Sequence, residues 1–158
     1  MTAATRSVVV LAALTAVAVV AVDQAAKTLA LSSLGSSSER DLIGTTLKLV
    51  DVRNTGVAFG KFSGGGVIVA VLVLLALGCL VWYFLRHLET PLIWLPTGMV
   101  VGGAIGNIVD RIRIGAVTDF IKLPHWPAFN FADAAITGGV IALVVLVEID
   151  ARRTAQGQ

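Results

Sequence analysis

Four runs of this chain contain no charged residue, and they restrict the possible folds more than any other feature of the sequence. The runs cover residues 7–22, 62–85, 90–109 and 134–147. Each approaches the length of about 20 apolar residues that a helix needs to cross a bilayer. Only 14% of all residues are charged, against roughly 25% in soluble domains. The sequence therefore predicts one integral membrane domain over residues 1–158, with transmembrane helices near residues 7–28, 66–86, 92–111 and 133–151.

The first run can also be interpreted as a secretory signal peptide, because Arg6 precedes an apolar stretch that ends in small residues. A retained helix fits the continuation of the chain better. Asp23 and Lys27 stand four positions apart just after the run, and this spacing places opposite charges on one helical face. We therefore expect the first helix to extend through these residues.

Both termini are expected on the same side of the membrane, because the number of spans is even. Arg6, Arg86 and Arg152 flank the spans on that side, which favours the cytoplasm under the positive-inside rule. The other side carries more cations, namely Arg40, Lys48, Arg53, Lys61, Arg111, Arg113 and Lys122. The charge pattern alone therefore leaves the orientation open.

Two further patterns predict local structure. Residues 45–53 alternate apolar and polar side chains, which predicts a strand within a small sheet region near residues 42–62, after a flexible Ser- and Gly-rich connection at 32–38. The third run carries small residues at helical spacing, which favours close helix packing: Gly98, Gly102, Gly103 and Gly106. This packing would also bring Asn107 and Asp110 against neighbouring helices.

Three aspartates, Asp110, Asp119 and Asp133, lie at or between the edges of the last two runs. An ionised carboxylate in hydrocarbon costs roughly 2.5–3.5 kcal/mol, so each one needs a role. Taken singly, Asp119 and Asp133 are explained as helix caps or ion-pair partners. They share their membrane face with a polar cluster too large for capping alone: Asn54, Asn107, Asn130 and Arg111. Two close carboxylates share a proton and can supply both a general base and a general acid.

Other chemistries find less support. His87 and His125 lie in different loops and Cys79 is the only cysteine, so we expect no metal site and no other cofactor. The chain has no Gly-x-Ser-x-Gly motif and no dense basic run of the kind that binds nucleic acid. The alternative class is a small transporter or proton-conducting bundle, which predicts carboxylates spread across the depth of the bilayer.

Five motifs, in order along the chain, resemble those of lipoprotein signal peptidases, the bacterial signal peptidase II family. They are DQAAK at residues 23–27, NTGVAFG at 54–60, GGAIGNIVDR at 102–111, VTDF at 117–120 and FNFAD at 129–133. The resemblance implies an all-α polytopic fold of four transmembrane helices, with a small extracytoplasmic β-cradle and a short extracytoplasmic helix or loop. It also implies the bacterial cytoplasmic membrane, with both termini in the cytoplasm and the active site near the extracytoplasmic face.

The activity that the resemblance implies is that of an aspartic endopeptidase that cuts prolipoproteins just before a diacylglyceryl-modified cysteine. Asp119 and Asp133 would then be the catalytic pair. The remaining motif residues would support the site or contact the substrate: Asp23, Lys27, Asn54, Gly103, Asn107, Asp110, Arg111 and Asn130. Within this set we expect Asp110 to orient Arg111, and we expect the Thr118 hydroxyl to donate to the Asp119 carboxylate.

The resemblance further implies contact with membrane lipids and inhibition by globomycin-type compounds, and we expect a monomer. Residues 121–128 form a shorter segment than in many members of the family. A shorter segment leaves less chain to cover the site, so the gating of substrate entry is expected to differ.

Overall fold

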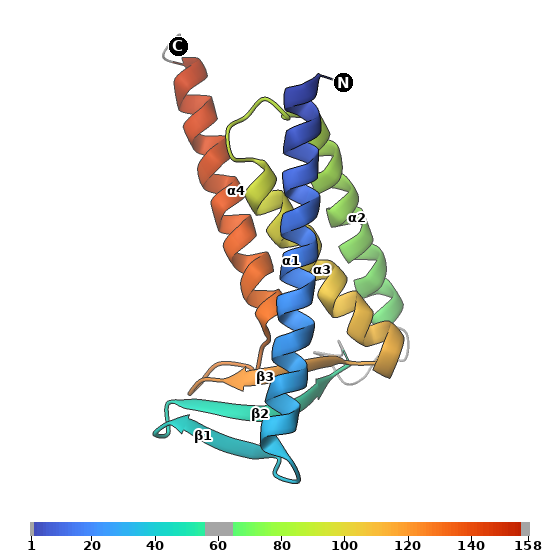
Figure 1. The fold of residues 1–158 in the computed structure, drawn as a ribbon, viewed down its shortest axis with the longest axis vertical. Helices are drawn as coiled ribbons and strands as arrows, with labels where there is room; N and C mark the ends of the chain where they lie inside the picture. Colours follow the sequence, from blue (N-terminus) through green and yellow to red (C-terminus); the bar gives the residue numbers. More distant parts are fainter. Residues whose placement is uncertain (1, 56–64, 156–158) are drawn as a thin grey trace.

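The computed structural model describes residues 2–55 and 65–155, and these form four helices and one small sheet. The helices are α1 (Ala3–Leu34), α2 (Gly65–Arg86), α3 (Trp94–Ile114) and α4 (Phe131–Ala155). The strands are β1 (Glu39–Ile43), β2 (Leu47–Asn54) and β3 (Val117–Lys122). The start of α1 and the end of α4 lie at one end of the helical bundle, and the sheet lies at the other (Figure 1).

Two of the described helices are long and apolar enough to cross a membrane, namely α1 and the part Phe131–Arg153 of α4. Within α2, the segment Leu75–Arg86 is also an apolar helix, but it is shorter than the other two. Large apolar side chains point outward from α1 and α4, among them Val17 and Val144. An apolar outer surface suits a lipid surrounding, because lipid tails are as apolar as these side chains.

The first helix continues through the charged pair as predicted, since α1 holds both Asp23 and Lys27. It also takes the first residues of the connection expected at 32–38. The helix ends before Gly35, which has a φ of 58°, a conformation that glycine adopts far more readily than other residues.

The sheet is antiparallel, with β2 between β1 and β3. Strand β2 confirms the strand predicted from alternation, whereas β1 and β3 were not predicted. All of β1 is exposed and the first four residues of β3 are all buried, so neither strand shows the period of two that reveals a half-buried strand. Leu49 and Phe120 pack against Ala30 and Leu34, which holds the sheet to the end of α1. Residues 56–62 of the predicted sheet region lie outside the described residues.

Glycines on α3 allow α1 and α4 to approach it closely. A Cβ atom at Gly98 would lie 2.7 Å from the carbonyl oxygen of Ala12, and one at Gly102 would lie 2.6 Å from that of Ala16. On the α4 side, a Cβ at Gly103 would lie 2.5 Å from the carbonyl oxygen of Ala132. These separations leave no room for a side chain, which confirms the packing role predicted for the small residues.

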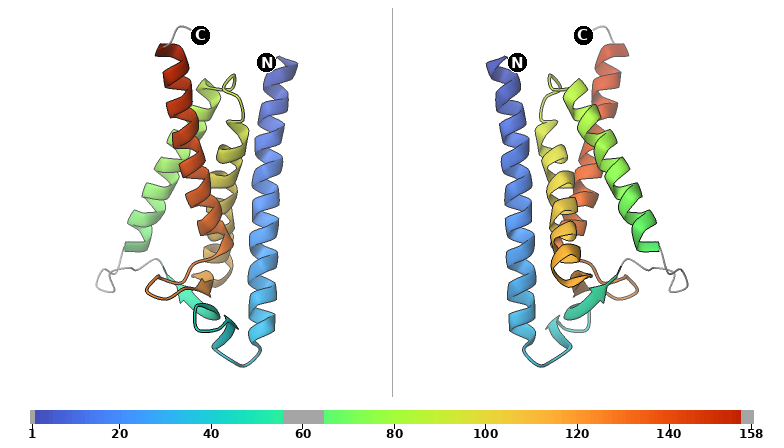
Figure 2. Two further views of the ribbon diagram at one scale, coloured as in Figure 1. Left: turned by 90° about the vertical axis from the view of Figure 1, so that its left-hand side faces the viewer. Right: turned by 90° about the vertical axis from the view of Figure 1, so that its right-hand side faces the viewer.

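Helix α2 stands apart from the other three. Figure 2 shows that it leans away from α3 toward the sheet end of the molecule. At its other end Phe84 packs with Ala12 of α1 and with Ile93, just before α3. The helix is therefore anchored at its last turns and diverges from the bundle toward the sheet.

Candidate active site

The two aspartates predicted to form a pair come from elements that meet at the sheet end of the bundle. Asp119 belongs to β3 and has an exposed fraction of 1%. Asp133 belongs to the first turn of α4 and is partly buried. The loop between them folds back, because Ile121 and Phe129 pair as an isolated bridge. Both aspartate side chains then accept a hydrogen bond from one residue in that loop, Asn130.

Asn130 joins the pair and is itself fully buried. Its amide nitrogen Nδ2 donates to Oδ1 of Asp119 at 2.6 Å. Its Oδ1 accepts from the backbone N–H of Asp133 at 2.9 Å, and Oδ2 of Asp133 accepts from the backbone N–H of Asn130 at 3.3 Å. This reciprocal arrangement is a capping box at the start of α4. One residue therefore caps the helix that carries Asp133 and holds the carboxylate of Asp119.

Two further carboxamides orient the pair. Asn54, the last residue of β2, donates to Oδ2 of Asp119 at 3.0 Å. Asn107 of α3 donates to Oδ1 of Asp133 at 2.8 Å, and its own Oδ1 accepts from Asn130 at 3.2 Å. Carboxamides are neutral donors, so they fix both carboxylates without adding charge. The structure thus brings together all three asparagines that the sequence assigned to the site.

The environment of Asp119 favours its protonated form. Burial raises the pKa of Asp119, the nearby Asp133 carboxylate raises it further, and the hydrogen bonds from Asn54 and Asn130 act in the opposite direction. A carboxyl group in this position keeps its proton to higher pH than an ordinary aspartate. Asp119 is therefore the carboxyl of the two that favours holding a proton.

A buried lysine lies beside the pair. The ammonium of Lys27 is 2.7 Å from Oδ2 of Asp23 and 3.0 Å from Oδ2 of Asp110. It also donates to Oδ1 of Asn107 at 3.3 Å. The ammonium is thus held between two carboxylates and reaches Asp133 through the side chain of Asn107.

The two carboxylates that hold Lys27 also fix the backbone on which the pair stands. Oδ1 of Asp23 accepts from the backbone N–H of Ala132 at 2.9 Å, immediately before Asp133. Oδ2 of Asp110 accepts from the backbone N–H of Thr118 at 2.9 Å, immediately before Asp119. Asp23, Lys27 and Asp110 therefore connect α1 and α3 to both elements that carry the pair.

Two contacts expected from the sequence are wrong. Asp110 does not turn toward Arg111, because adjacent residues of a helix face different directions; Arg111 is exposed and donates to the carbonyl of Asn107 at 3.4 Å. The Thr118 hydroxyl accepts from Arg53 at 3.0 Å. Side chains alternate between the faces of a strand, so Thr118 and Asp119 point away from each other.

One residue of the site received no role from the sequence. Nε2 of Gln24 lies within hydrogen-bond distance of Oδ2 of Asp23 at 3.1 Å, of the Gly106 carbonyl at 3.2 Å and of Oδ1 of Asp110 at 3.0 Å. The sequence signal that could have identified Gln24 as a site residue is its position inside the DQAAK motif. Gly106 itself must lack a side chain, because a Cβ there would lie 2.7 Å from Oδ2 of Asp23.

The described residues contain no group of three or more His, Cys, Asp or Glu side chains that could hold a metal ion. Four aspartates gather instead in one network at the sheet end, which differs from the spread across the bilayer that a transporter predicts: Asp23, Asp110, Asp119 and Asp133. A cleft of about 210 Å³ opens beside Lys27, between Arg53 and Arg113.

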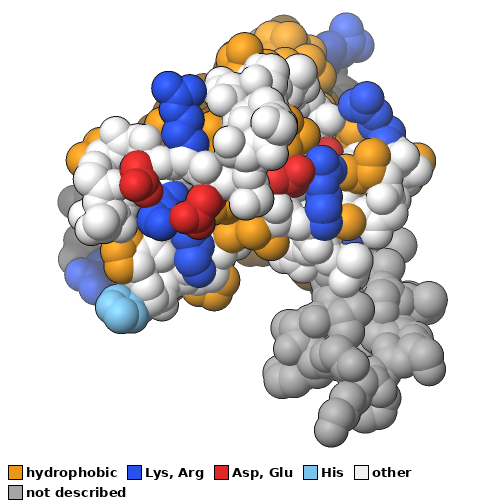
Figure 3. Space-filling model, turned by 90° about the horizontal axis from the view of Figure 1, so that it is seen from below, with side chains coloured by type: hydrophobic (Ala, Val, Ile, Leu, Met, Phe, Trp, Pro, Cys, Tyr) orange, Lys and Arg blue, Asp and Glu red, His pale blue; other side chains and the backbone are white. Residues whose placement is uncertain are grey.

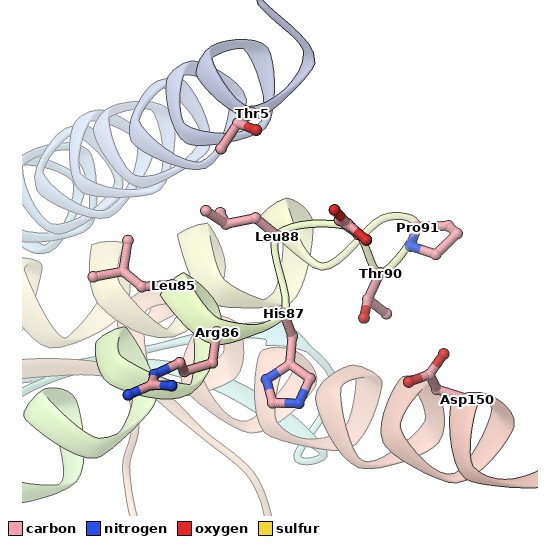
Figure 4. A pocket seen from close by; sticks show the side chains of 9 residues that line it. Thr5, Leu85, Arg86, His87, Leu88, Thr90, Pro91 and Asp150 are labelled. Atoms are coloured by element: carbon pink, nitrogen blue, oxygen red, sulfur yellow. The ribbon is translucent and has the colours of Figure 1, made fainter. Parts of the chain in front are cut away.

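Other charged groups lie away from this network. On the outer face of the sheet end, acidic and basic side chains are interspersed (Figure 3), and Lys48 pairs with Glu39 there at 3.1 Å. A pocket of about 490 Å³ lies at the opposite end of the bundle, where Arg86, His87 and Asp150 line it (Figure 4). Its position at the far ends of α2 and α4 separates it from the aspartate pair.

Comparison with known proteins places the chain beside one family. The family model described as "Signal peptidase (SPase) II" matches residues 15–149. The chain is 42% identical over 135 residues to the lipoprotein signal peptidase of Syntrophomonas wolfei subsp. wolfei, with 85% of this chain and 91% of the relative covered. It is 40% identical over 131 residues to that of Moorella thermoacetica, with 82% and 87% covered. A solved bacterial membrane enzyme has a similar fold, with a TM-score of 0.77, 29% identity and coverage of 86% of this chain and 91% of the other.

Proposed function

Because this chain belongs to the signal peptidase II family, we propose that Asp119 and Asp133 are the catalytic pair with which it removes signal peptides from prolipoproteins. The chain is an aspartic peptidase of the membrane, so its chemistry needs two carboxyl groups that act together. One observation carries the assignment: the buried amide of Asn130 holds Asp119 and caps the helix turn that presents Asp133.

The surroundings of the two carboxyls give them different roles. Asp133 lies in the first turn of α4, where the helix dipole stabilises a negative charge, so it acts as the ionised base. Asp119 is buried and its pKa is raised, so it holds the shared proton. Asp133 takes a proton from water while the water oxygen bonds to the scissile carbonyl carbon, and Asp119 gives its proton to the carbonyl oxygen. The C–N bond then breaks as the leaving nitrogen takes the proton from Asp133, and one hydroxyl of the diol returns its proton to Asp119, which leaves a carboxylic acid and restores the pair.

The remaining residues of the site position this pair. Asn54, Asn107 and Asn130 orient the carboxylates, and the buried network of Lys27 holds the backbone beneath them. Gly103 acts through close packing of α3 against Ala132. The exposed guanidinium of Arg111 offers a fork of donors to the substrate backbone.

The proposed substrate is a prolipoprotein cut just before its diacylglyceryl-modified cysteine. We place all four helices across the cytoplasmic membrane as one domain and one monomer, with the sheet end outside and both termini in the cytoplasm. The sheet and the pair share one end of the bundle, and the start of α1 and the end of α4 share the other, so the two are assigned to opposite faces of the membrane. The choice of the cytoplasmic face rests on the resemblance to the family. Membrane lipids and globomycin-type inhibitors are the other expected ligands.

The test replaces each aspartate by asparagine and measures cleavage of a purified prolipoprotein. We expect Asp119→Asn and Asp133→Asn to remain folded in the membrane and to lose roughly 10²–10⁴-fold or more in rate. The matched control is Asp41→Asn, an exposed aspartate of β1 that pairs with Lys48, which should cleave normally. Normal turnover by either variant of the pair would contradict the assignment.

A second experiment tests the lipid in the proposed substrate. A substrate without its diacylglyceryl group should be cut poorly, and equal cleavage of the substrates with and without this group would remove the lipid from the proposal.

A further inference from the structure

An apolar groove of about 280 Å³ lies between α2, α3 and α4. Every side chain that lines it is apolar, and six of them, two from each helix, form its walls: Leu77, Leu80, Val100, Ala104, Ile136 and Val140. The groove exists because α2 packs against α3 and diverges from the rest of the bundle toward the sheet (Figure 2).

One end of the groove adjoins the aspartate pair. Ile136 follows Asp133 by three residues on α4, and Ala104 precedes Asn107 by three residues on α3. Residues three apart share a helical face, so the groove begins about one turn, ~5 Å, from the residues that hold the pair. From Asp133 to Val140 it follows α4 for ~10 Å, away from the sheet.

A signal peptide contains an apolar region of about 7–15 residues before its cleavage site. As a helix this region is ~10–22 Å long, which matches the direction and the scale of the groove. When the scissile bond lies at the pair, the apolar region has to extend from the pair into the membrane. The groove is an apolar surface that starts beside the pair and runs in that direction.

We infer that this groove binds the apolar segment of the signal peptide during cleavage, an inference that rests on the proposed function. The gain comes from orientation, because a segment held against the helices keeps the scissile bond beside the carboxyls. Small residues such as Ala104 let a helix approach closely, and close packing is what drives helix association in lipid.

The test compares two synthetic substrates with the same diacylglyceryl-cysteine cleavage site. One carries a segment of about 12 leucine and alanine residues before the site, and the other keeps only about four residues, below the apolar length of a signal peptide. The variant is Val140→Trp, which fills the groove. The control is Val145→Trp on the same helix, since Val140 and Val145 have exposed fractions of 46% and 51% and Val145 is five positions away, on the other side of α4.

The measured quantity is the ratio of kcat/KM for the long substrate to that for the short one. We expect the unmodified protein to prefer the long substrate, Val140→Trp to reduce the ratio about tenfold through a higher KM, a loss of ~1.4 kcal/mol in substrate binding, and Val145→Trp to leave it unchanged. An unchanged ratio in Val140→Trp would mean that the groove holds lipid and would overturn the inference, as would equal reductions in both variants. Failure of the unmodified protein to cut either substrate would instead count against the proposed function.

Discussion

Replacing Lys27 by methionine tests whether the buried ammonium holds the site together. Methionine is similar in length and apolar, so the change removes the charge and leaves most of the volume. Asp23 and Asp110 then lose the partner that lies 2.7 and 3.0 Å away. Lys27, Asp23 and Asp110 are only 4%, 0% and 6% exposed, so water cannot take the place of the ammonium.

The expected cost follows from this burial. Removing one partner of a buried ion pair destabilises a protein by about 3–5 kcal/mol, against a total stability of about 5–15 kcal/mol. We therefore expect Lys27→Met to lose roughly 3–5 kcal/mol in the free energy of unfolding. Activity should fall with it, because Asp23 and Asp110 fix the backbone N–H groups of Ala132 and Thr118 beside the pair.

A triple variant separates charge from shape. In Lys27→Met with Asp23→Asn and Asp110→Asn, each asparagine keeps an oxygen that can accept from the same backbone N–H, while no buried charge is left unpaired. It should recover most of the stability lost by the single variant. The matched control is Lys48→Met on β2, whose pair with Glu39 is exposed, so this change should alter stability little.

The assay is equilibrium unfolding by denaturant in detergent micelles, with cleavage of a lipidated substrate measured on the same samples. Two results would refute the role assigned to Lys27. One is a Lys27→Met protein within about 1 kcal/mol of the unmodified chain, the size of an exposed pair. The other is a triple variant no more stable than the single one, since the loss would then arise from shape.

Two further predictions concern packing and pH. Gly103→Ala places a Cβ 2.5 Å from the Ala132 carbonyl oxygen. We therefore expect this variant to lose about 1–3 kcal/mol of stability, measured by thermal unfolding, and to cleave its substrate more slowly. The control is Gly78→Ala, where nothing lies within 4 Å of the added Cβ, and equal stability of the two variants would contradict the close approach. Burial raises the pKa of Asp119, so the contribution of Asp119 to stability should be most favourable below the ordinary aspartate pKa, where this carboxyl holds its proton in folded and unfolded chains alike, and should fall as pH rises to the raised pKa. The asparagine of Asp119→Asn cannot ionise, so this variant should gain stability relative to the unmodified chain as pH rises over that range. If the difference in stability between the two proteins stayed the same at every pH, Asp119 would ionise without a burial penalty.

The polar residues of the site could be predicted because each stands in a motif near the end of a helix or strand. Asn130 and Asp133 begin α4, Asn54 ends β2 and Asn107 approaches the end of α3. The four apolar runs fix the order of the helices, and that order alone brings these ends to one end of the bundle. Membership of one cluster therefore follows from the sequence, without knowledge of any individual contact.

The individual contacts could not be predicted, because they depend on tertiary geometry. The pairing of Val52 with Asp119 sets the register of β3, and that register sends the Thr118 side chain to Arg53. Likewise, Asp110 contacts Lys27 because glycines let α1 approach α3 closely. The distance between these two helices cannot be predicted from a local sequence pattern. The expected partner of Asp110, Arg111, was adjacent in sequence, and adjacency on a helix separates two side chains.

The position of Lys27 explains how an aspartate near a buried cation can still keep a proton. An ammonium in direct contact with Asp119 would lower the pKa of that carboxyl and favour loss of its proton. Lys27 is occupied instead by Asp23 and Asp110, with Asn107 between the ammonium and Asp133. Its charge therefore lowers the pKa of Asp119 less than burial raises it. Asp23 and Asp110 thus hold the backbone beneath the pair and also keep the Lys27 ammonium away from Asp119. Asp119, the acid that the proposed reaction needs, therefore stays protonated.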